Sequence, residues 1–487
     1  MNRIKIFTLL SILVALVACN ERKQTEKSIL LYCASGIKQP VAELAAMYSE
    51  KYNVQVNIQY GGSGTLLSNL QIAKKGDLYL AGDNSYLNTA KEKGLVKEVQ
   101  PLSQMLPVII VKKGNPKNIK SIEDLKRNDV KVSLGNPEAC AVGELFKEVC
   151  EQSGDWEAIK SNAKVFKPTV NEMAADVEIG SVDACVGWNA TVMLYDDLEA
   201  VSIGTDEALV RTIEVGVLNA SQQPTEALKF LRFLSSQEFG NPTFAKHGFK
   251  PIKGDTWSEN PKVVLLSGGM NRLAVEPTIQ RFEQREGVEI TRIYNGCGVL
   301  VAQIKAGTEL DAYLTCDTSY LTQVEPMFKD INTLTETKII IITQKGNPKN
   351  INALSDLTKA GLKVGVTNPE QSALGYLVQK LLKQRGLADD VNKNVCSQTP
   401  TADMLVNQLR TGALDAALVY ISNVTLVKDK IDIVAIDGAG NSAVQNYGIV
   451  KKSDNGWIMK RLLEELSAEK SVESFGDNGM VFIGEQL

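Results

Sequence analysis

The chain contains the same pattern twice. The heptapeptide KGNPKNI stands at residues 113–119 and again at 345–351, and the matches around it keep the same offset. Further upstream the offset is slightly longer, as between Asp83 and Asp317. A period above roughly 200 residues is far longer than that of a solenoid repeat and indicates that a whole domain was duplicated. Whatever fold this sequence adopts, it must therefore be built twice.

The duplication predicts the domain organisation. We expect a first unit at residues 28–256 and a second unit at 262–487. Between them, residues 257–261 form the predicted linker, in a segment rich in proline, glycine and polar residues. The length of 487 residues, of which 44% are hydrophobic, suits globular folding into several domains.

The N-terminus has the features of an export signal. A positively charged start precedes an apolar run at residues 6–18, which is shorter than a membrane-spanning helix requires. The run ends in Leu-Val-Ala-Cys and resembles a bacterial lipobox, in which cleavage leaves a lipidated cysteine. The resemblance predicts a signal peptide at 1–18, lipidation of Cys19 and a polar tether at 19–27. We expect a protein of the cell envelope, anchored to a membrane by lipid and facing either the periplasm or the outside.

A glycine-rich turn indicates what each unit binds. Residues 54–60 predict a strand, the sequence GGSG at 61–64 a turn, and residues 65–74 a helix. This arrangement aims backbone N–H groups at an anion. Strands that alternate with helices form parallel sheets, and ligands gather at the carboxyl ends of such strands. Ser63 in the turn and Ser35 after the first predicted strand both lie at such ends.

The order of the predicted elements favours an α/β fold with two lobes in each unit. Apolar runs at residues 108–111 and 215–218 predict strands that cross from one lobe to the other. Two lobes joined by crossing strands would enclose a hinged cleft.

Several functions are disfavoured by composition. A net charge of −4 gives no reason to expect nucleic acid as a partner. The chain has one histidine, His247, and no cluster of nucleophile, base and orienting group, so we expect no enzyme and no cofactor. It has no CxxC motif, which disfavours a metal site. Without Cys19, seven of the eight cysteines remain, and an odd number cannot all pair within the chain.

Taken in order, these features resemble type II periplasmic binding proteins, in particular the molybdate- and tungstate-binding group. The motifs are Ala-Ser-Gly after the first strand, Gly-Gly-Ser-Gly after the second, the Lys-Gly-Asn-Pro turn, Asn-Pro-Glu before a helix, and Gly-x-x-Asp-Ala-x-x-x-aromatic. The resemblance covers nearly all of both copies. It implies two tandem type II units, each of two α/β lobes with a hinged cleft.

The resemblance also implies the site residues of the first copy. In that family two serine hydroxyls, backbone amides and often a tyrosine hold a tetrahedral oxyanion. Carried onto the first copy, these roles fall on Ser35, Ser63, an amide near Ala141, and Trp188 at the position of the tyrosine.

The second copy departs further from the family pattern. There the same roles fall on Gly269, Cys297, Ala373 with the nearby Ser372, and Tyr420. The tyrosine is present, but both serines are replaced. Asp83 and Asp317 also stand at strand ends, where we expect them to cap helices rather than to bind ligand.

Three functions follow as alternatives. The first is a solute-binding lipoprotein that captures molybdate or tungstate and delivers it to the permease of an ABC importer. The second is a binding protein of the same fold for another small anion, such as phosphate, sulfate or an organic acid. The third is an anchored interaction or assembly protein in which one or both clefts no longer bind, and the lost serines favour this reading for the second copy.

Overall fold

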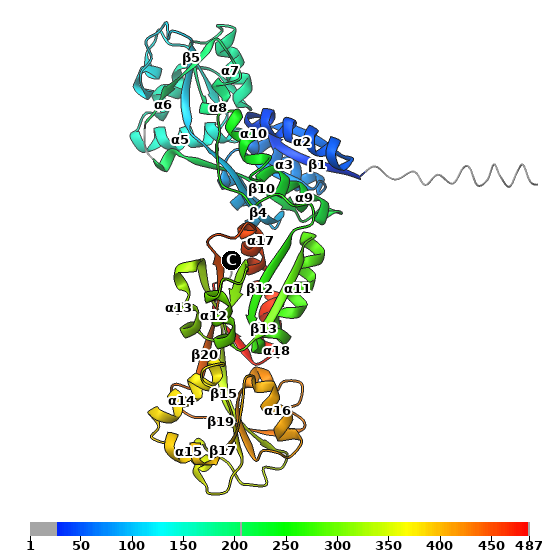
Figure 1. Ribbon diagram of the computed structural model, residues 1–487. Coiled ribbons are helices and arrows are strands. Elements are labelled where there is room, and N and C mark those ends of the chain that lie inside the picture. The colour runs from blue at the N-terminus through cyan, green and yellow to red at the C-terminus, as the bar shows by residue number, and fades with distance from the viewer. Residues whose placement is uncertain (1–26, 205–206, 486–487) are drawn as a thin grey trace, which may run out of the picture. The chain divides into compact units, whose positions relative to one another are not determined.

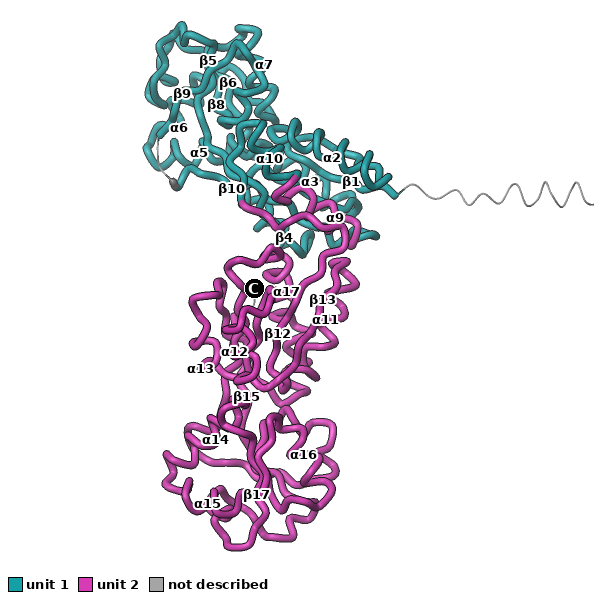
Figure 2. The backbone as a smooth tube through the Cα atoms, in the orientation of Figure 1, with its two compact units in different colours: residues 1–223, 239–252 teal, residues 224–238, 253–487 magenta. Residues whose placement is uncertain are grey.

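The computed structural model describes residues 27–204 and 207–485. The predicted signal peptide, the lipidation site Cys19 and nearly all of the tether lie outside these residues. The chain divides into two compact units, coloured separately in Figure 2. Unit 1 comprises residues 1–223 and 239–252, and unit 2 comprises residues 224–238 and 253–487. Each is a mixed α/β body of two lobes, as the sequence predicted (Figure 1).

The first lobe of unit 1 is built on a six-stranded sheet with the order β11-β4-β10-β3-β1-β2. Its strands are β1 (Lys27–Ala34), β2 (Val54–Gly61), β3 (Leu78–Ala81), β4 (Val96–Met105), β10 (Arg211–Leu218) and β11 (Lys250–Pro251). Its helices are α2 (Lys38–Tyr52), α3 (Ser63–Ala73), α4 (Asn84–Glu92) and α10 (Gly240–Lys246). A short 3-10 turn, Ser35–Ile37, follows β1.

The second lobe of unit 1 has a five-stranded sheet with the order β7-β6-β8-β5-β9. Its strands are β5 (Pro107–Lys112), β6 (Val132–Gly135), β7 (Ala163–Lys167), β8 (Ala184–Trp188) and β9 (Leu198–Ser202). Its helices are α5 (Ala141–Ser153), α6 (Trp156–Asn162), α7 (Val170–Glu178) and α8 (Asn189–Val192), with 3-10 turns at Ile122–Lys126 and Glu207–Leu209.

The parallel register of the first sheet places the turns that follow β1, β2 and β3 at one edge. Strand β1 pairs in parallel with β2, with Ala34 opposite Gly61, and in parallel with β3. The carboxyl ends of the three strands therefore lie side by side, and the chain leaves them at Ser35, at Gly62 and at Gly82. The sequence-based expectation that these strand ends converge is confirmed.

The boundary between the lobes of unit 1 lies at a proline. Strand β4 ends at Met105 and β5 begins at Pro107, which has no N–H group, so the backbone ladder is interrupted here. The amide of Leu106 donates instead to Oδ1 of Asn189 at 2.8 Å. In unit 2 the equivalent stretch is one continuous strand, β15 (Phe328–Gln344), which serves both lobes.

Unit 2 therefore has a single ten-stranded sheet with the order β13-β12-β14-β20-β15-β18-β16-β17, to which β19 and β21 add by pairing with β15. Its other strands are β12 (Lys262–Gly268), β13 (Glu289–Asn295), β14 (Ala312–Leu314), β16 (Val364–Thr367), β17 (Val395–Thr399), β18 (Ala416–Tyr420), β19 (Ile431–Ala435), β20 (Ser442–Val450) and β21 (Met480–Phe482). Four consecutive isoleucines of β15, residues 339–342, are buried, as expected for a central strand covered on both faces.

Helices cover this sheet. They are α9 (Pro224–Ser235), α11 (Arg272–Glu286), α12 (Cys297–Lys305), α13 (Thr318–Thr322), α14 (Ala373–Gln384), α15 (Ala388–Asn394), α16 (Ala402–Arg410), α17 (Gly456–Leu466) and α18 (Glu469–Asp477). Shorter 3-10 turns lie at Gly269–Asn271, Glu325–Met327, Leu354–Thr358 and Ile421–Asn423.

A buried ion triad attaches α9 to the rest of unit 2. Arg232 on α9 contacts Glu286 on α11 at 2.9 Å, and Nε of Arg461 on α17 donates to the same carboxylate at 3.0 Å. The three side chains are 6%, 2% and 3% exposed. Burial by itself would raise the pKa of Glu286, but the charges of Arg461 and Arg232 outweigh it and hold that pKa below its ordinary value. Since an uncompensated charge here would be costly, the triad requires all three partners.

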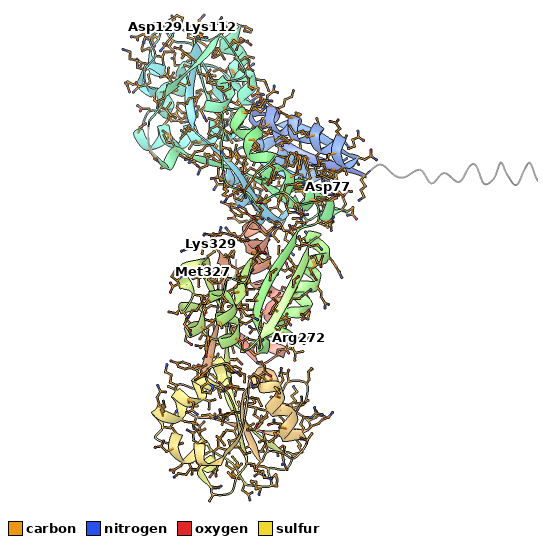
Figure 3. All side chains as sticks on the ribbon, in the orientation of Figure 1. Asp77, Lys112, Asp129, Arg272, Met327 and Lys329 are labelled. Carbon is orange, nitrogen blue, oxygen red and sulfur yellow. A yellow bond between two sulfur atoms is a disulfide. The ribbon has the colours of Figure 1, made fainter. Side chains whose placement is uncertain are left out.

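The duplication extends to individual tertiary contacts. Asp77, labelled in Figure 3, precedes β3 and accepts a hydrogen bond from the amide of Leu30 at 2.9 Å. Asp311 does the same in unit 2, accepting from the amide of Val264 at 2.8 Å. Within residues 27–204 and 207–485, no helix has the length and apolarity that crossing a bilayer would require.

Candidate functional site

The four residues predicted for the first copy come together in one pocket of unit 1. Ser35, Ser63, Ala141 and Trp188 all line it, and its volume is about 300 Å³, including space open to solvent. Ser35 and Ser63 come from the first lobe, whereas Ala141 and Trp188 come from the second. The pocket is therefore formed between the lobes of this unit, at the carboxyl ends of β1, β2 and β8.

Ser63 is held with its hydroxyl group ready to donate. It is the first residue of α3, and the N-cap is Gly62, so the Ser63 side chain does not serve as the helix cap. Its Oγ accepts a hydrogen bond from the amide of Gly82 at 3.0 Å. The hydroxyl of Tyr79 fixes the backbone by donating to the carbonyl oxygen of Ser63 at 2.8 Å. Because Oγ is occupied as an acceptor, its proton can point to a ligand.

The turn that carries Ser63 is packed directly against the other lobe. The amide of Gly64 donates to the carbonyl oxygen of Ala139 at 3.2 Å. A Cβ atom at Gly62 would collide with the carbonyl oxygens of Ala139 and Pro168. Only glycine allows this approach, so the two lobes of unit 1 are closed on one another around the pocket.

The remaining predicted residues sit where the lobes meet. Ser35 begins the 3-10 turn after β1, and its carbonyl oxygen accepts from Nδ2 of Asn171 at 3.1 Å. Ala141 is the first residue of α5 and is 6% exposed. Trp188 ends β8 and is 3% exposed. Among the described residues, these elements bring all four predicted positions of the first copy to one cavity.

The electrostatics of this pocket favour an anion without protons. Of the described residues that line it, none carries a charged side chain, and its side-chain hydroxyls belong to Ser35, Ser63 and Thr169. Helices α3 and α5 begin at the pocket, and helix N-termini favour negative charge. Burial raises the pKa of the Cys140 thiol to about 11, so this neighbour stays neutral. The pocket offers hydrogen-bond donors to a ligand that can only accept.

Unit 2 has a pocket at the equivalent place, with a different lining. Its volume is about 330 Å³, including space open to solvent, and it is lined by Gly269, Ser372 and Tyr420 among others. Cys297 and Ala373 do not line it, because they are 0% and 1% exposed at the first positions of α12 and α14. Of the positions predicted for the second copy, the structure thus brings Gly269, Ser372 and Tyr420 to the pocket, whereas Cys297 and Ala373 do not line it.

Cys297 is bonded to Cys316 in a disulfide. These two positions correspond to Ser63 and Gly82 of unit 1, at the same offset that relates Asp83 to Asp317. The disulfide was not predicted, because Cys316 stood out by no motif, although the offset places it opposite Gly82. A disulfide sulfur carries no proton, so Cys297 cannot donate as the serine does. Of the other described cysteines, Cys33, Cys140, Cys150 and Cys185 are buried and free, and Cys396 is exposed and free.

Four polar residues that line the unit 2 pocket were missed by the sequence analysis, namely Asn295, Thr401, Asp403 and Asn423. Asp403 in the first turn of α16 and Asn423 after β18 both line it, and Nδ2 of Asn423 donates to Oδ1 of Asp403 at 3.1 Å. The hydroxyl of Tyr420 is buried without a hydrogen-bond partner among the described residues. Burial raises the pKa of Tyr420 well above its ordinary value, so the hydroxyl keeps its proton. The offset of the KGNPKNI repeat places Asn171 opposite Asp403. This change from asparagine to aspartate between the copies is the sequence feature that could have drawn attention to Asp403.

The two aspartates at strand ends serve as helix caps, as expected. Asp83 accepts from the amide of Ser85 at 2.8 Å, and Asp317 accepts from the amide of Ser319 at 3.0 Å. Within the described ranges, no three side chains of histidine, cysteine, aspartate or glutamate are grouped so that they could hold a metal ion.

The comparison with protein families matches this chain twice. The family described as bacterial extracellular solute-binding protein aligns with residues 29–250 and with residues 263–481. A Haemophilus influenzae protein, named only as a binding protein, is 28% identical over 228 residues. These residues make up 46% of this chain and 91% of that protein.

Two further relatives have names that specify a ligand. The molybdate-binding protein ModA of Mycobacterium bovis is 26% identical over 187 residues, covering 37% of this chain and 69% of ModA. A sulfate-binding protein of Synechococcus elongatus is 25% identical over 197 residues, covering 35% of this chain and 56% of that protein. Each relative aligns with less than half of this chain, in keeping with a chain that repeats one unit.

Proposed function

Because the chain belongs to the family of bacterial extracellular solute-binding proteins, we propose that its unit 1 captures molybdate or tungstate for the permease of an ABC importer. The observation that supports this ligand class is the pocket of unit 1, which has hydroxyl groups that can donate and, among the described lining residues, no carboxylate that would repel an anion. Ser35 and Ser63 supply hydroxyl groups, α3 and α5 supply helix N-termini, and the pocket has no charged side chain among the residues described. The ModA relative is named for molybdate.

The physical argument is one of hydrogen-bond balance. A fully ionised tetrahedral oxyanion has acceptor oxygens only, so every contact must come from a donor. Charge-assisted hydrogen bonds contribute roughly 1.5–3 kcal/mol each. Several of them, together with two helix N-termini, can replace a cationic side chain. A pocket of this kind binds a dianion without using any bound metal.

Sulfate is the second candidate for the same pocket. It is also a tetrahedral dianion without protons at neutral pH, and one relative is named as a sulfate-binding protein. Since sulfate and molybdate make the same demands on donors, size decides between them. The ligand-class proposal is common to both.

We further propose that the protein is held at the cell envelope by lipid on Cys19, where a binding protein would meet its transporter. The support is the lipobox-like sequence before that residue. Its named relatives are binding proteins, and we assign this chain no catalytic role.

The deciding experiment is calorimetric titration of the chain without its predicted signal peptide and lipid, residues 20–487, with molybdate, tungstate and sulfate. We expect saturable binding of molybdate or tungstate at one site per chain. Weaker binding of these two than of sulfate would assign the pocket to sulfate. The absence of binding for all three anions would refute the proposed ligand class.

A further inference from the structure

We propose that the pocket of unit 2 binds hydrogen phosphate, an oxyanion that carries a proton of its own, and that the two units therefore take different ligands. The inference rests on the proposed function only in treating the cleft of each unit as an anion site. It is carried by the polar groups that line the second pocket, which differ in kind from those of the first. The deciding property is the balance of hydrogen-bond donors and acceptors.

Unit 2 has lost the two hydroxyl donors of unit 1. Gly269 stands where unit 1 has Ser35, and Cys297 stands where it has Ser63. The disulfide with Cys316 leaves Cys297 without a proton to donate. The pocket of unit 2 has other hydroxyl groups, those of Ser372, Thr401 and Tyr420, so the two pockets present their donors from different positions.

Unit 2 has gained acceptors in return. Asp403 lines the pocket with a carboxylate, which repels a bare dianion and can accept a hydrogen bond from a protonated one. Oδ1 of Asn423 is buried without a hydrogen-bond partner in the described chain. The orientation of this amide is set by its other end, because only the NH₂ group can donate to Asp403, and it does so at 3.1 Å.

One unused donor faces the same space. The hydroxyl of Tyr420 is buried and has no partner within the described residues, and its side chain is 3% exposed. A buried hydroxyl without a hydrogen bond is costly, so a ligand that accepts from Tyr420 would stabilise the site. A ligand that uses all of these groups accepts from Tyr420 and donates to Asp403 or Asn423. Hydrogen phosphate does both, whereas sulfate and molybdate can only accept.

The corresponding positions of unit 1 do not form such a set. Asn171 stands opposite Asp403 and Thr191 opposite Asn423, and neither lines the pocket of unit 1. Asn171 instead donates to the carbonyl oxygen of Ser35 at 3.1 Å. Oδ1 of Asn171 and Oγ1 of Thr191 are also buried without a partner among the described residues, but these side chains do not line the unit 1 pocket, so only in unit 2 do the acceptors at these positions line the pocket.

The test is calorimetric titration of residues 20–487 with inorganic phosphate and with sulfate at pH 7. We expect phosphate to bind one site per chain, at least tenfold more tightly than sulfate binds that site. Asp403→Asn should weaken phosphate binding at least tenfold, because the amide replaces one of the two acceptor oxygens of the carboxylate by an NH₂ donor. Tyr420→Phe should weaken phosphate binding by a similar factor. Ser63→Ala should leave phosphate unchanged while it weakens molybdate.

The matched control is Asp389→Asn, which removes a carboxylate from the first turn of α15, another exposed helix start in unit 2 that does not line the pocket. It should leave phosphate binding unchanged. Asp403 is exposed, so its variant tests the proposal even if Tyr420→Phe fails to fold. The proposal is overturned if phosphate does not bind, if Asp403→Asn binds it as the parent does, or if Ser63→Ala abolishes it. If molybdate does not bind but phosphate does, the ligand proposed for unit 1 is refuted and the proposal for unit 2 stands.

Discussion

The amide of Cys316 donates to Sγ of Cys297 at 3.0 Å, the distance at which the amide of Gly82 donates to Oγ of Ser63 in unit 1. The same backbone contact is thus built twice, once around a hydroxyl and once around a disulfide. The exchange removes a proton donor and adds a covalent link between α12 and the segment that follows β14. Its consequences for stability and for ligand binding can be measured separately.

Removing the disulfide should destabilise unit 2. Its cysteines are 19 residues apart in sequence, and closing a loop of this length stabilises a fold by about 3 kcal/mol. We expect Cys297→Ser combined with Cys316→Gly to lower the urea midpoint of one of two unfolding transitions. Tryptophan fluorescence with and without a reducing agent would measure it. Cys396→Ser, at an exposed free cysteine, is the control and should change nothing.

Replacing Ser63 by alanine should weaken anion binding in unit 1. The variant removes a hydroxyl donor from a buried, largely desolvated pocket, and we expect a loss of roughly 1–3 kcal/mol of binding free energy. Titration with molybdate measures the effect. Ser68→Ala is a matched control on the same helix, because Ser68 is exposed and its hydroxyl donates only to the carbonyl oxygen of Gly64. Equal affinities of the two variants would remove Ser63 from the site.

Gly62→Ala should prevent closure of the lobes of unit 1. The added methyl group meets the carbonyl oxygens of Ala139 and Pro168, which are backbone atoms and cannot turn aside. Such overpacking costs about 1–3 kcal/mol, so molybdate should bind roughly tenfold more weakly or worse. Gly476→Ala is the control, since nothing lies within 4 Å of its added carbon. Unchanged molybdate affinity in Gly62→Ala would show that binding does not need this contact.

Glu286→Gln should destabilise unit 2 strongly. It leaves Arg232 and Arg461 buried together without their shared carboxylate, and breaking a buried ion group of this kind costs about 3–5 kcal/mol. Thermal or urea unfolding measures the change. Glu289→Gln is the control, because Glu289 is paired at the surface with Lys262, and its loss should cost less than about 1 kcal/mol. A small effect of Glu286→Gln would mean that packing, not charge, attaches α9.

The same carboxylate should make unit 2 sensitive to acid. The pKa of Glu286 is held below its ordinary value of 4.5 in the folded state. The stability it contributes is therefore fully present above pH 4.5 and is lost as the pH falls through the folded-state pKa. We expect the urea midpoint of unit 2 to drop over this acidic range, and to drop less steeply in Glu286→Gln. Parallel pH profiles of parent and variant would contradict this assignment.

Much of the fold was predictable from local sequence. Runs such as residues 54–60, followed by a glycine-rich turn and an apolar helix, determine a strand, a turn and a helix because side-chain periodicity and glycine act over a few residues. The repeat then determines that the architecture occurs twice. Ser35 and Ser63 could be placed at one sheet edge because parallel strands end together.

The rest depended on contacts between segments far apart in the chain. That Ala141 and Trp188 meet the serines follows only from how the second lobe packs on the first. The role of Asp403 depends on its contact with Asn423, and no local sequence pattern predicts that contact.

The sequence by itself therefore determined the duplication, the α/β units and the strand ends at which an anion would sit, because these follow from local periodicity and strand direction. Only the tertiary structure decided that Cys297 pairs with Cys316, and that α9 joins unit 2 through Arg232. Both require atoms from separate segments to come within bonding distance, which the packing of the whole unit controls.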